Sequence, residues 1–463
     1  MPRGGVVHAL ELGDALADAG QHVSLCAPDA DHAGLFRAPR AARCRFVAVP
    51  ATPVDGPLVT LVAQRIADWL RYFDTTPGAL DHDIFHAQDS ISANALATLV
   101  ERGRLRAYVR TVHHLDRFAD AQLDAWQTRG VTAAGRVLCV SDGWRCTLGR
   151  DHGVDAQVVG NGVDRRRFSP EASAEDAVLA RRLGVGGAGG VGGVDGACYP
   201  GGVGHVGNGR GPGDVGGSAG VAGPAALRDA DAGPWLLSVG GVEARKNTLN
   251  ALAAFVRVRK DRPGARWWIA GGASLLDHSA YAARFRAAVA EAGLTLGPDA
   301  PIVPLGRVDD AAMPALFRLA DALLFPSLTE GFGLVVLEAL ASGTPAVVSR
   351  IAPFTEYLDD AAVEWAAPED AASIAAALGR ALDATPARAA ARRAAGFAVC
   401  ARYGWSRSAR THLQVYRAFR AALPAGEAGS DVAGRVANGV PGDILSDIPD
   451  NIPGALSKEI LHA

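Results

Sequence analysis

Short apolar runs alternate with amphipathic stretches along most of this chain, and this alternation restricts the fold more than any other feature of the sequence. An apolar run of about four to eight residues is typical of a strand buried on both faces, and helical periodicity follows most of these runs. Strands that alternate with helices form parallel sheets with helices on both faces, the doubly wound α/β architecture. We expect strands at residues 22–27, 84–86, 108–113, 137–141, 158–161, 236–239, 267–270, 302–305, 322–325 and 346–349.

The alternation occurs twice, which predicts two domains. A chain of 463 residues is too long for one small core. Residues 184–223 hold 19 glycines in 40 positions, a composition that cannot bury a core. We therefore expect two Rossmann-like domains that face each other across a cleft. The predicted boundaries are an N-terminal domain at 1–172, a flexible glycine-rich insert at 173–234, a second domain at 235–400, a further helix at 401–424 and a flexible tail at 425–463.

The beginning of the chain departs from the usual order of a doubly wound domain. Such a domain normally opens with a strand, and its first glycine turn comes after that strand. Here the glycine turn, Gly4-Gly5, comes first and the helix at 6–19 follows it. We expect that the first strand of the N-terminal domain is missing, for instance through a start codon assigned too late. The alternative is a domain that begins with a helix.

Composition excludes several functions. The net charge of −3 provides no basic footprint for nucleic acid. No stretch reaches the roughly 18 apolar residues of a membrane span, and no signal peptide is recognisable. The six cysteines have no CxxC spacing, which favours reduced thiols in a cytoplasmic protein, and we expect no metal site. Arginine is the usual cation, since the chain has only three lysines: Lys246, Lys260 and Lys458.

Residues 325–338 carry the strongest functional signal. An apolar strand leads into a loop with Glu330, the turn Gly331-Phe332-Gly333-Leu334 follows, and a helix then contains Glu338. A strand, a glycine turn and a helix together aim backbone N–H groups at a phosphate or sugar. The two carboxylates can accept hydrogen bonds from ligand hydroxyl groups. The segment thus predicts a nucleotide-sugar site, and the alternative is two glutamates on a solvated helix face.

Three further places complete the predicted site. Arg245 and Lys246 follow the strand at 236–239, where cations suit a diphosphate leaving group; the alternative is a solvated basic pair. Gly4 and Gly5 would let the backbone approach a phosphate, or else have no role. His113 and its neighbour His114 end the strand at 108–113 and would face the cleft; the alternative is that they pack or lie on the surface.

These motifs resemble the retaining GT-B glycosyltransferases of family 4, the glycosyl transferases group 1, in a sub-group of actinobacterial type. The resemblance covers about residues 3–172 and 235–423. Many members of that family carry an arginine five residues before the lysine, where this chain has Gly241. The motifs that carry the resemblance are Arg3–His8, Thr111–His113, Asn161–Asp164, Gly240–Asn247, Glu330–Glu338 and Pro353–Leu358.

The resemblance implies a role for each predicted residue. Lys246 would bind the donor diphosphate with help from Arg245, and Glu338 would accept hydrogen bonds from the ribose. Glu330 would contact the transferred sugar, with His113 on its other side. The backbone of Gly331, Phe332, Gly333 and Leu334 would surround sugar and phosphates, Gly4 and Gly5 would form the opposite wall, and the helix at 405–422 would cross back to the first domain.

The implied activity is that of a hexosyltransferase (EC 2.4 class), which moves a hexose from a nucleoside diphosphate sugar to an acceptor hydroxyl without a metal ion or other cofactor. Alternatives are a nucleotide-sugar epimerase of the same fold and an inactive, truncated binding protein. The expected partners are a nucleotide sugar and an acceptor that is a glycan, a lipid or a small molecule. Nucleic acid is not expected, and a peripheral contact with a membrane stays open.

Overall fold

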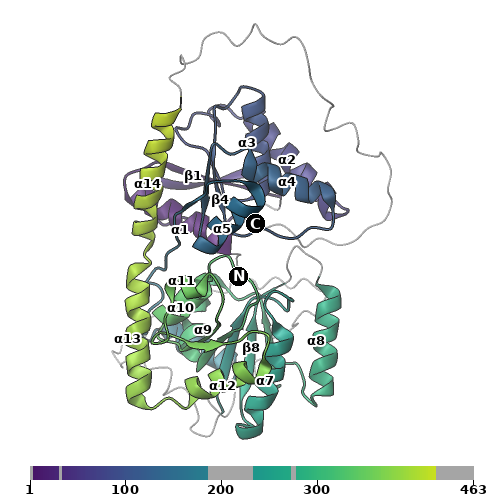
Figure 1. Ribbon diagram of the computed structural model, residues 1–463, viewed down its shortest axis with the longest axis vertical. Coiled ribbons are helices and arrows are strands. Elements are labelled where there is room, and N and C mark those ends of the chain that lie inside the picture. Colours follow the sequence, from purple (N-terminus) through teal and green to yellow (C-terminus); the bar gives the residue numbers. More distant parts are fainter. Residues whose placement is uncertain (1–3, 31–33, 186–232, 273–277, 424–463) are drawn as a thin grey trace, which may run out of the picture.

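Two α/β lobes lie one above the other along the long axis of the molecule (Figure 1). The computed structural model describes residues 4–30, 34–185, 233–272 and 278–423. Every sheet is parallel, so the predicted fold class of two doubly wound domains is confirmed. None of the helices within these ranges has the length and apolar character that a membrane crossing requires.

The N-terminal lobe contains two separate sheets. One pairs β1 with β2, and the other has the order β3-β4-β5-β6; no hydrogen-bonded strand joins them among the described residues. The prediction that an opening strand is missing stays a prediction. The elements of this lobe are α1 (Gly4–Asp18), β1 (Val23–Asp29), β2 (Cys44–Pro50), α2 (Leu58–Thr75), β3 (His86–Ala87), α3 (Ser90–Glu101), β4 (Val109–Val112), α4 (Ala121–Thr132), β5 (Arg136–Cys139), α5 (Asp142–His152) and β6 (Gln157–Val158).

The C-terminal lobe is built on one six-stranded sheet with the order β12-β11-β10-β7-β8-β9. Strand β7 is the first strand of this sheet in chain order and pairs with β10 in the middle of the sheet. The chain continues from β7 to β8 on one side and from β10 to β11 on the other, so the loops after β7 and β10 diverge at the centre. Its elements are β7 (Trp235–Val239), α7 (Thr248–Asp261), β8 (Arg266–Ala270), α8 (Ser279–Glu291), β9 (Ile302–Gly306), the 3-10 helix η2 (Asp310–Ala312), α9 (Met313–Leu319), β10 (Ala322–Phe325), α10 (Leu334–Ala341), β11 (Ala346–Ser349), α11 (Phe354–Tyr357), β12 (Glu364–Ala366) and α12 (Ala371–Leu382).

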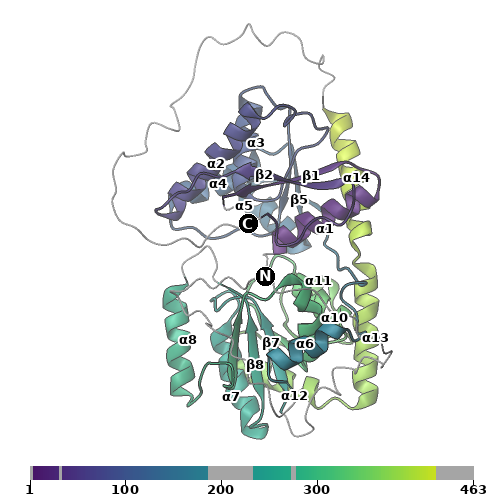
Figure 2. The same ribbon diagram turned by 180° about the vertical axis from the view of Figure 1, so that it is seen from behind.

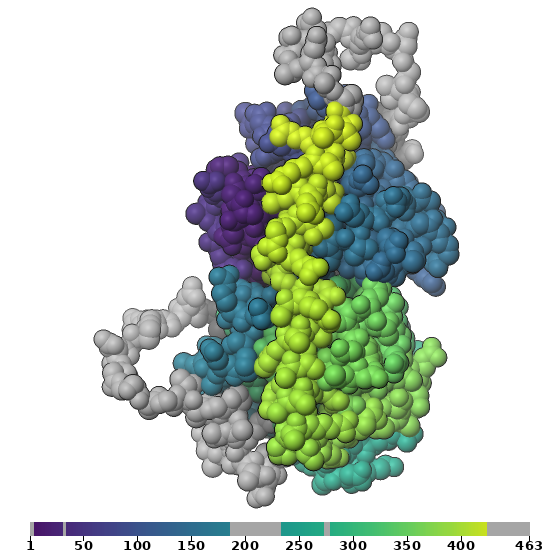
Figure 3. Space-filling model, turned by 60° about the vertical axis from the view of Figure 1, so that its left-hand side comes forward, coloured from purple at the N-terminus to yellow at the C-terminus, as the bar shows by residue number. Residues whose placement is uncertain are grey.

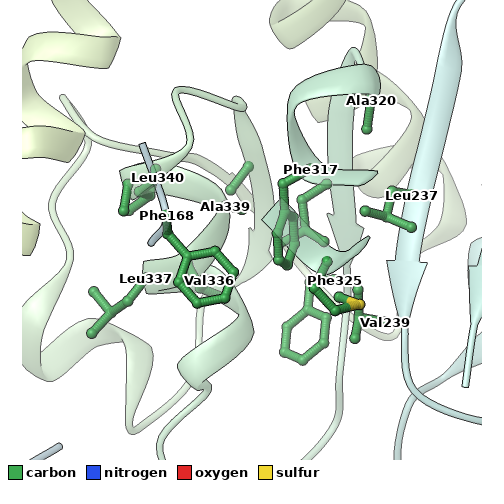
Figure 4. Close-up of a cluster of buried hydrophobic side chains, with 14 of the residues drawn as sticks. Phe168, Leu237, Val239, Phe317, Ala320, Phe325, Val336, Leu337, Ala339 and Leu340 are labelled. Atoms are coloured by element: carbon green, nitrogen blue, oxygen red, sulfur yellow. The ribbon is translucent and has the colours of Figure 1, made fainter. Parts of the chain in front are cut away.

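The largest hydrophobic core lies on one face of this sheet. Side chains of β7 and β10 pack there against α9 and α10, as Figure 4 shows. Phe168, from the segment that links the lobes, packs its ring against Phe317 with 5.9 Å between ring centroids. The link is therefore anchored in the second lobe, and removing this apolar surface from water holds α10 against the sheet.

Two consecutive helices connect the lobes along one side of the molecule. Helix α13 (Pro386–Arg402) packs on α10, and α14 (Trp405–Ala422) packs on α1 in the other lobe. Figure 3 shows them as one continuous ridge over both lobes. Helix α14 buries Val415 and Phe419 against Val109 and Leu138 of the four-stranded sheet. Helices α13 and α14 together thus connect the two lobes.

Several expectations need correction. Gly4 and Gly5 do not form a turn but lie in the first turn of α1. The insert predicted at 173–234 begins with an ordered helix, α6 (Ala174–Arg182), which packs on α9 beside the second lobe (Figure 2). Most of the remaining insert, the tail at 425–463 and residues 1–3 lie outside the described residues. The sequence did not predict the strands β2 and β12 or the helix α13.

Candidate active site

The loop after β10 has the geometry predicted for residues 325–338. Gly333 is the N-cap of α10 with φ of 89°, a backbone conformation that glycine adopts without strain. A Cβ atom at this position would overlap the Phe354 ring. Phe332 stacks on Tyr357 at 4.7 Å, and the Tyr357 hydroxyl donates a hydrogen bond to the Phe332 carbonyl oxygen at 3.0 Å. These contacts hold the loop and the start of α10 in one conformation.

The loop after β7 is tied directly to the loop after β10. The Leu328 N–H donates to the Arg245 carbonyl oxygen at 2.9 Å. Asn247 donates from its side-chain amide to the Pro326 carbonyl oxygen at 3.0 Å. Gly240 leaves room for a lysine stem, since a Cβ there would lie 2.7 Å from Cε of Lys246. The two loops therefore place the predicted cations beside the predicted carboxylate.

Lys246, Arg245 and Glu330 form one charged cluster. Glu330 Oε1 lies 2.7 Å from Lys246 Nζ and 3.0 Å from Arg245 Nη1. Burial would raise the pKa of Glu330, but the two cations hold it below its ordinary value. Burial lowers the pKa of Lys246, although Glu330 opposes this shift. Lys246 Nζ also lies 4.3 Å from the centroid of the Phe325 ring. Glu243 Oε2 lies 3.5 Å from Arg245 Nη2, so two carboxylates face the two cations when no anion is bound to them.

Glu338 lies on α10 in a different electrostatic environment. Its side chain is buried, and burial raises its pKa to about 7, with Asp310 and Glu11 adding to the shift and Arg167 opposing it. Arg167 pairs with Asp310 at 2.8 Å, and Arg37 pairs with Glu11 at 2.5 Å. This network joins α1 to the second lobe beside Glu338. No sequence motif pointed to it, since its members come from four separate segments.

The first lobe supplies the opposite wall, and His113 lies at its centre. A Cβ on Gly331 would overlap the His113 carbonyl oxygen, so the β10 loop and the end of β4 are in contact. A Cβ on Gly5 would lie 3.2 Å from Cδ2 of His113, and one on Gly4 would lie 4.0 Å from Leu334. Both glycines thus reach the predicted site, although they belong to a helix.

His113 is a buried, neutral histidine. Burial lowers its pKa well below the ordinary value, and nearby His8 and Arg110 lower it further. Sequence reasoning missed His8, which packs edge-on against His113 with 4.6 Å between ring centroids. His8 Nδ1 lies 2.5 Å from Asn161 Oδ1. His114 is half exposed at 48% and lies 3.6 Å from Asp116, so the surface interpretation fits this residue.

The two lobes also meet beside this site through Glu356. Its carboxylate accepts hydrogen bonds from the backbone N–H groups of Asp142 at 2.7 Å and Gly143 at 2.8 Å. These N–H groups begin α5, where the helix dipole favours a negative charge. Within the described ranges, no group of three or more histidine, cysteine, aspartate or glutamate side chains is arranged to hold a metal ion.

Two family models match this chain, one for each lobe. The model described as Glycosyltransferase Family 4 matches residues 2–167, and the one described as Glycosyl transferases group 1 matches residues 225–396. Glycogen synthase of Mycobacterium tuberculosis is 34% identical over 197 residues, which are 42% of this chain and 45% of that protein. D-inositol 3-phosphate glycosyltransferase of Segniliparus rotundus is 32% identical over 188 residues, 39% of each chain. The chain thus spans less than half the length of these curated relatives.

Solved structures share the fold over most of the chain. Sucrose-phosphate synthase from Thermosynechococcus elongatus superposes with a TM-score of 0.66 at 21% identity and covers 89% of this chain and 92% of its own. Anabaena Alr3699/HepE in complex with UDP-glucose gives a TM-score of 0.62 at 14% identity, over 90% of this chain and 97% of its own. At these identities the likeness establishes the two-lobed fold alone.

Proposed function

This chain belongs to the group 1 glycosyltransferases with the GT-B fold, and on that premise we propose that it moves a hexose from a nucleoside diphosphate sugar to an acceptor hydroxyl. We propose further that the anomeric configuration is retained and that no metal ion takes part. The observation that carries the proposal is the cluster of Lys246, Arg245 and Glu330 at the centre of the sheet edge, opposite His113. Crevices at such a switch point are preferred ligand sites in open α/β sheets.

In this proposal Lys246 and Arg245 bind the donor diphosphate. Both cations now contact Glu330, so phosphate oxygens would take over the two ion pairs when the donor binds. Negative charge develops on the diphosphate as the bond to the sugar breaks, and two fixed cations stabilise it most at that stage. The N-terminus of α10 adds backbone N–H groups, which favour a phosphate. These groups supply the charge stabilisation that a metal ion would otherwise provide.

The remaining residues are assigned to sugar and ribose. Glu330, released from the cations, would accept a hydrogen bond from a hydroxyl group of the transferred hexose, with the backbone of residues 331–334 around it. Glu338 would accept hydrogen bonds from the ribose. His113 would lie on the far side of the sugar, and the contact of Glu356 with α5 would keep the lobes together and exclude water.

The test is donor turnover by purified protein. We would incubate it with uridine, adenosine and guanosine diphosphate hexoses and with glycan, lipid and small sugar acceptors, and measure nucleoside diphosphate release with EDTA present. Lys246→Ala should lower kcat/KM by about a hundredfold or more, as expected when one donor to the transition state is lost. Lys260→Ala is the matched control, since Lys260 is an exposed lysine on α7.

Product analysis by NMR would test the finer assignments. An axial product linkage from an axial donor supports retention, and an inverted linkage refutes it. Activity that disappears with EDTA and returns with Mg²⁺ would refute metal independence. A changed sugar nucleotide formed from the donor alone would argue against transfer to an acceptor. Absence of turnover with every donor and acceptor, both with EDTA and with Mg²⁺, would contradict the proposed activity itself.

A further inference from the structure

Gln88 is the side chain that hydrogen-bonds to the imidazole of His113. It follows β3 and is half buried. Its Oε1 atom lies 2.9 Å from His113 Nε2. Its amide nitrogen lies 3.3 Å and 3.4 Å from the two ring nitrogens of His86. The amide therefore has its oxygen toward His113 and its NH₂ group toward His86.

His86 is itself fixed by two hydroxyl groups. Its Nδ1 lies 2.6 Å from the Tyr416 hydroxyl, and its Nε2 lies 2.7 Å from the Thr111 hydroxyl. Tyr416 belongs to α14, the helix that packs on the first lobe (Figure 3). A continuous chain of polar contacts thus runs from this C-terminal helix through His86 and Gln88 to His113. Buried polar networks of this kind restrict the orientation of each member.

The contact with Gln88 determines which nitrogen of His113 carries the proton. A carbonyl oxygen only accepts, so His113 must donate from Nε2. The ring is neutral because burial lowers its pKa well below the ordinary value, and the facing groups His8, Arg110, His114 and His86 all lower it further. A neutral ring has one N–H group, so its lone pair is on Nδ1.

We propose that Gln88 is a positioning residue for the transfer reaction. It holds His113 as the Nε2–H tautomer, which leaves Nδ1 to accept a hydrogen bond from a hydroxyl group of the transferred sugar. Gly5 supports this orientation because its missing side chain gives the ring room next to α1. The role of Nδ1 rests on the proposed function of the site, whereas the tautomer does not.

The tautomer can be read by NMR on protein labelled with ¹⁵N-histidine. The wild type should show His113 protonated at Nε2 and unprotonated at Nδ1. Gln88→Leu removes the acceptor, so the ring should become a mixture of tautomers and kcat should fall about tenfold, the factor for one lost hydrogen bond. Gln127→Leu is the matched control, because within the described residues this buried glutamine hydrogen-bonds to the backbone of Asp116 alone, and its loss should leave the His113 signals unchanged.

Gln88→Glu provides a second readout that a merely structural role would not move. The carboxylate still accepts from Nε2–H, so the variant should keep most of the wild-type kcat at pH 8. It also raises the pKa of His113, and protonation of Nδ1 removes the acceptor. At saturating donor, kcat of the variant should therefore fall as the pH decreases from 8 to 6, while kcat of the wild type stays level.

The outcomes separate this proposal from the proposed function. A wild-type His113 protonated at Nδ1, or an unchanged tautomer and unchanged kcat in a folded Gln88→Leu, overturns the role of Gln88. If Gln88→Leu does not fold, a kcat of Gln88→Glu that stays constant between pH 8 and pH 6 would also overturn the role of Gln88. A protein that turns over no donor but shows the Nε2–H tautomer, lost in Gln88→Leu, refutes the transferase and upholds the control of His113 by Gln88.

Discussion

Removal of the Glu330 carboxylate should make the second lobe depend on an anionic ligand for its stability. The side chains of Glu330 and Lys246 are 9% and 13% exposed and lie 2.7 Å apart. Glu330→Ala would leave the Lys246 ammonium group buried next to Arg245 without its direct ion-pair partner. The carboxylate that remains nearby, Glu243, pairs with Arg245. Loss of one partner from a buried ion pair costs about 3–5 kcal/mol. We expect about 3 kcal/mol, near the lower limit of that range, because Arg245 is 41% exposed and remains hydrated.

For a domain of this size, that loss of unfolding free energy corresponds to a decrease in Tm of roughly 6–12 °C. The assay is thermal unfolding followed by differential scanning fluorimetry with and without inorganic pyrophosphate. Pyrophosphate should raise the Tm of Glu330→Ala by more than that of the wild type, because it no longer competes with the carboxylate for the cations and binding to the folded state adds stability.

Two comparisons test the reasoning. The double variant Glu330→Ala/Lys246→Ala removes both buried charges. It should be more stable than Glu330→Ala alone, because no unpaired ammonium group stays buried and the effects of residues in contact do not add. Asp383→Ala breaks an exposed pair with Arg262 and should cost about 1 kcal/mol at most. The coupling of the two charges would be refuted if the loss of unfolding free energy in the double variant equalled the sum of the losses in the two single variants. The dependence on an anionic ligand would be refuted if pyrophosphate stabilised Glu330→Ala no more than the wild type.

Three further predictions concern residues around this cluster. Donor affinity should increase between pH 6 and 8, because Glu338, with a pKa of about 7, loses its proton in this range and becomes a carboxylate that only accepts hydrogen bonds. Calorimetry with an intact nucleotide sugar should show that Glu338→Gln removes this pH dependence. Glu356→Ala removes the acceptor of the backbone N–H groups of Asp142 and Gly143, so the free energy of unfolding should fall by about 1 kcal/mol. The radius of gyration measured by X-ray scattering should increase. Gly333→Ala, strained at φ 89° and overlapping Phe354, should lose roughly 2 kcal/mol in urea unfolding.

Each of these predictions has a control and a contrary result. The raised pKa of Glu338 means that the folded state holds its proton more tightly, so this group lowers stability as pH rises from about 4.5 to about 7. Glu338→Gln should reduce this dependence of stability on pH, and an unchanged dependence would contradict the raised pKa of Glu338. Glu369→Ala, at an exposed glutamate of the same lobe, should leave the radius of gyration unchanged. A Gly333→Ala protein as stable as wild type would show that the β10 loop is not constrained.

Local sequence patterns located most of the strands and the main loops of the site. The strand predicted at 322–325 and the helix after Gly333 form as expected, because apolar strands and left-handed glycine positions depend mainly on neighbouring residues. Strand β12 escaped detection because three residues are too short for a period to appear. Gly4 and Gly5 were taken for a turn on composition, yet both lie in the first turn of α1, where they approach Leu334 and His113 from distant parts of the chain.

The sequence by itself determined the two-domain α/β fold and the candidate residues Lys246, Glu330 and Glu338, since each lies in a motif with a local physical meaning. Only the tertiary structure decided how these groups interact. It placed both cations on Glu330, raised the pKa of Glu338 by burial, and connected His113 through Gln88 to the C-terminal helix. Such contacts join residues separated by up to 330 positions. Charge pairing, desolvation and tautomer choice depend on distances across the folded chain, which no local pattern contains.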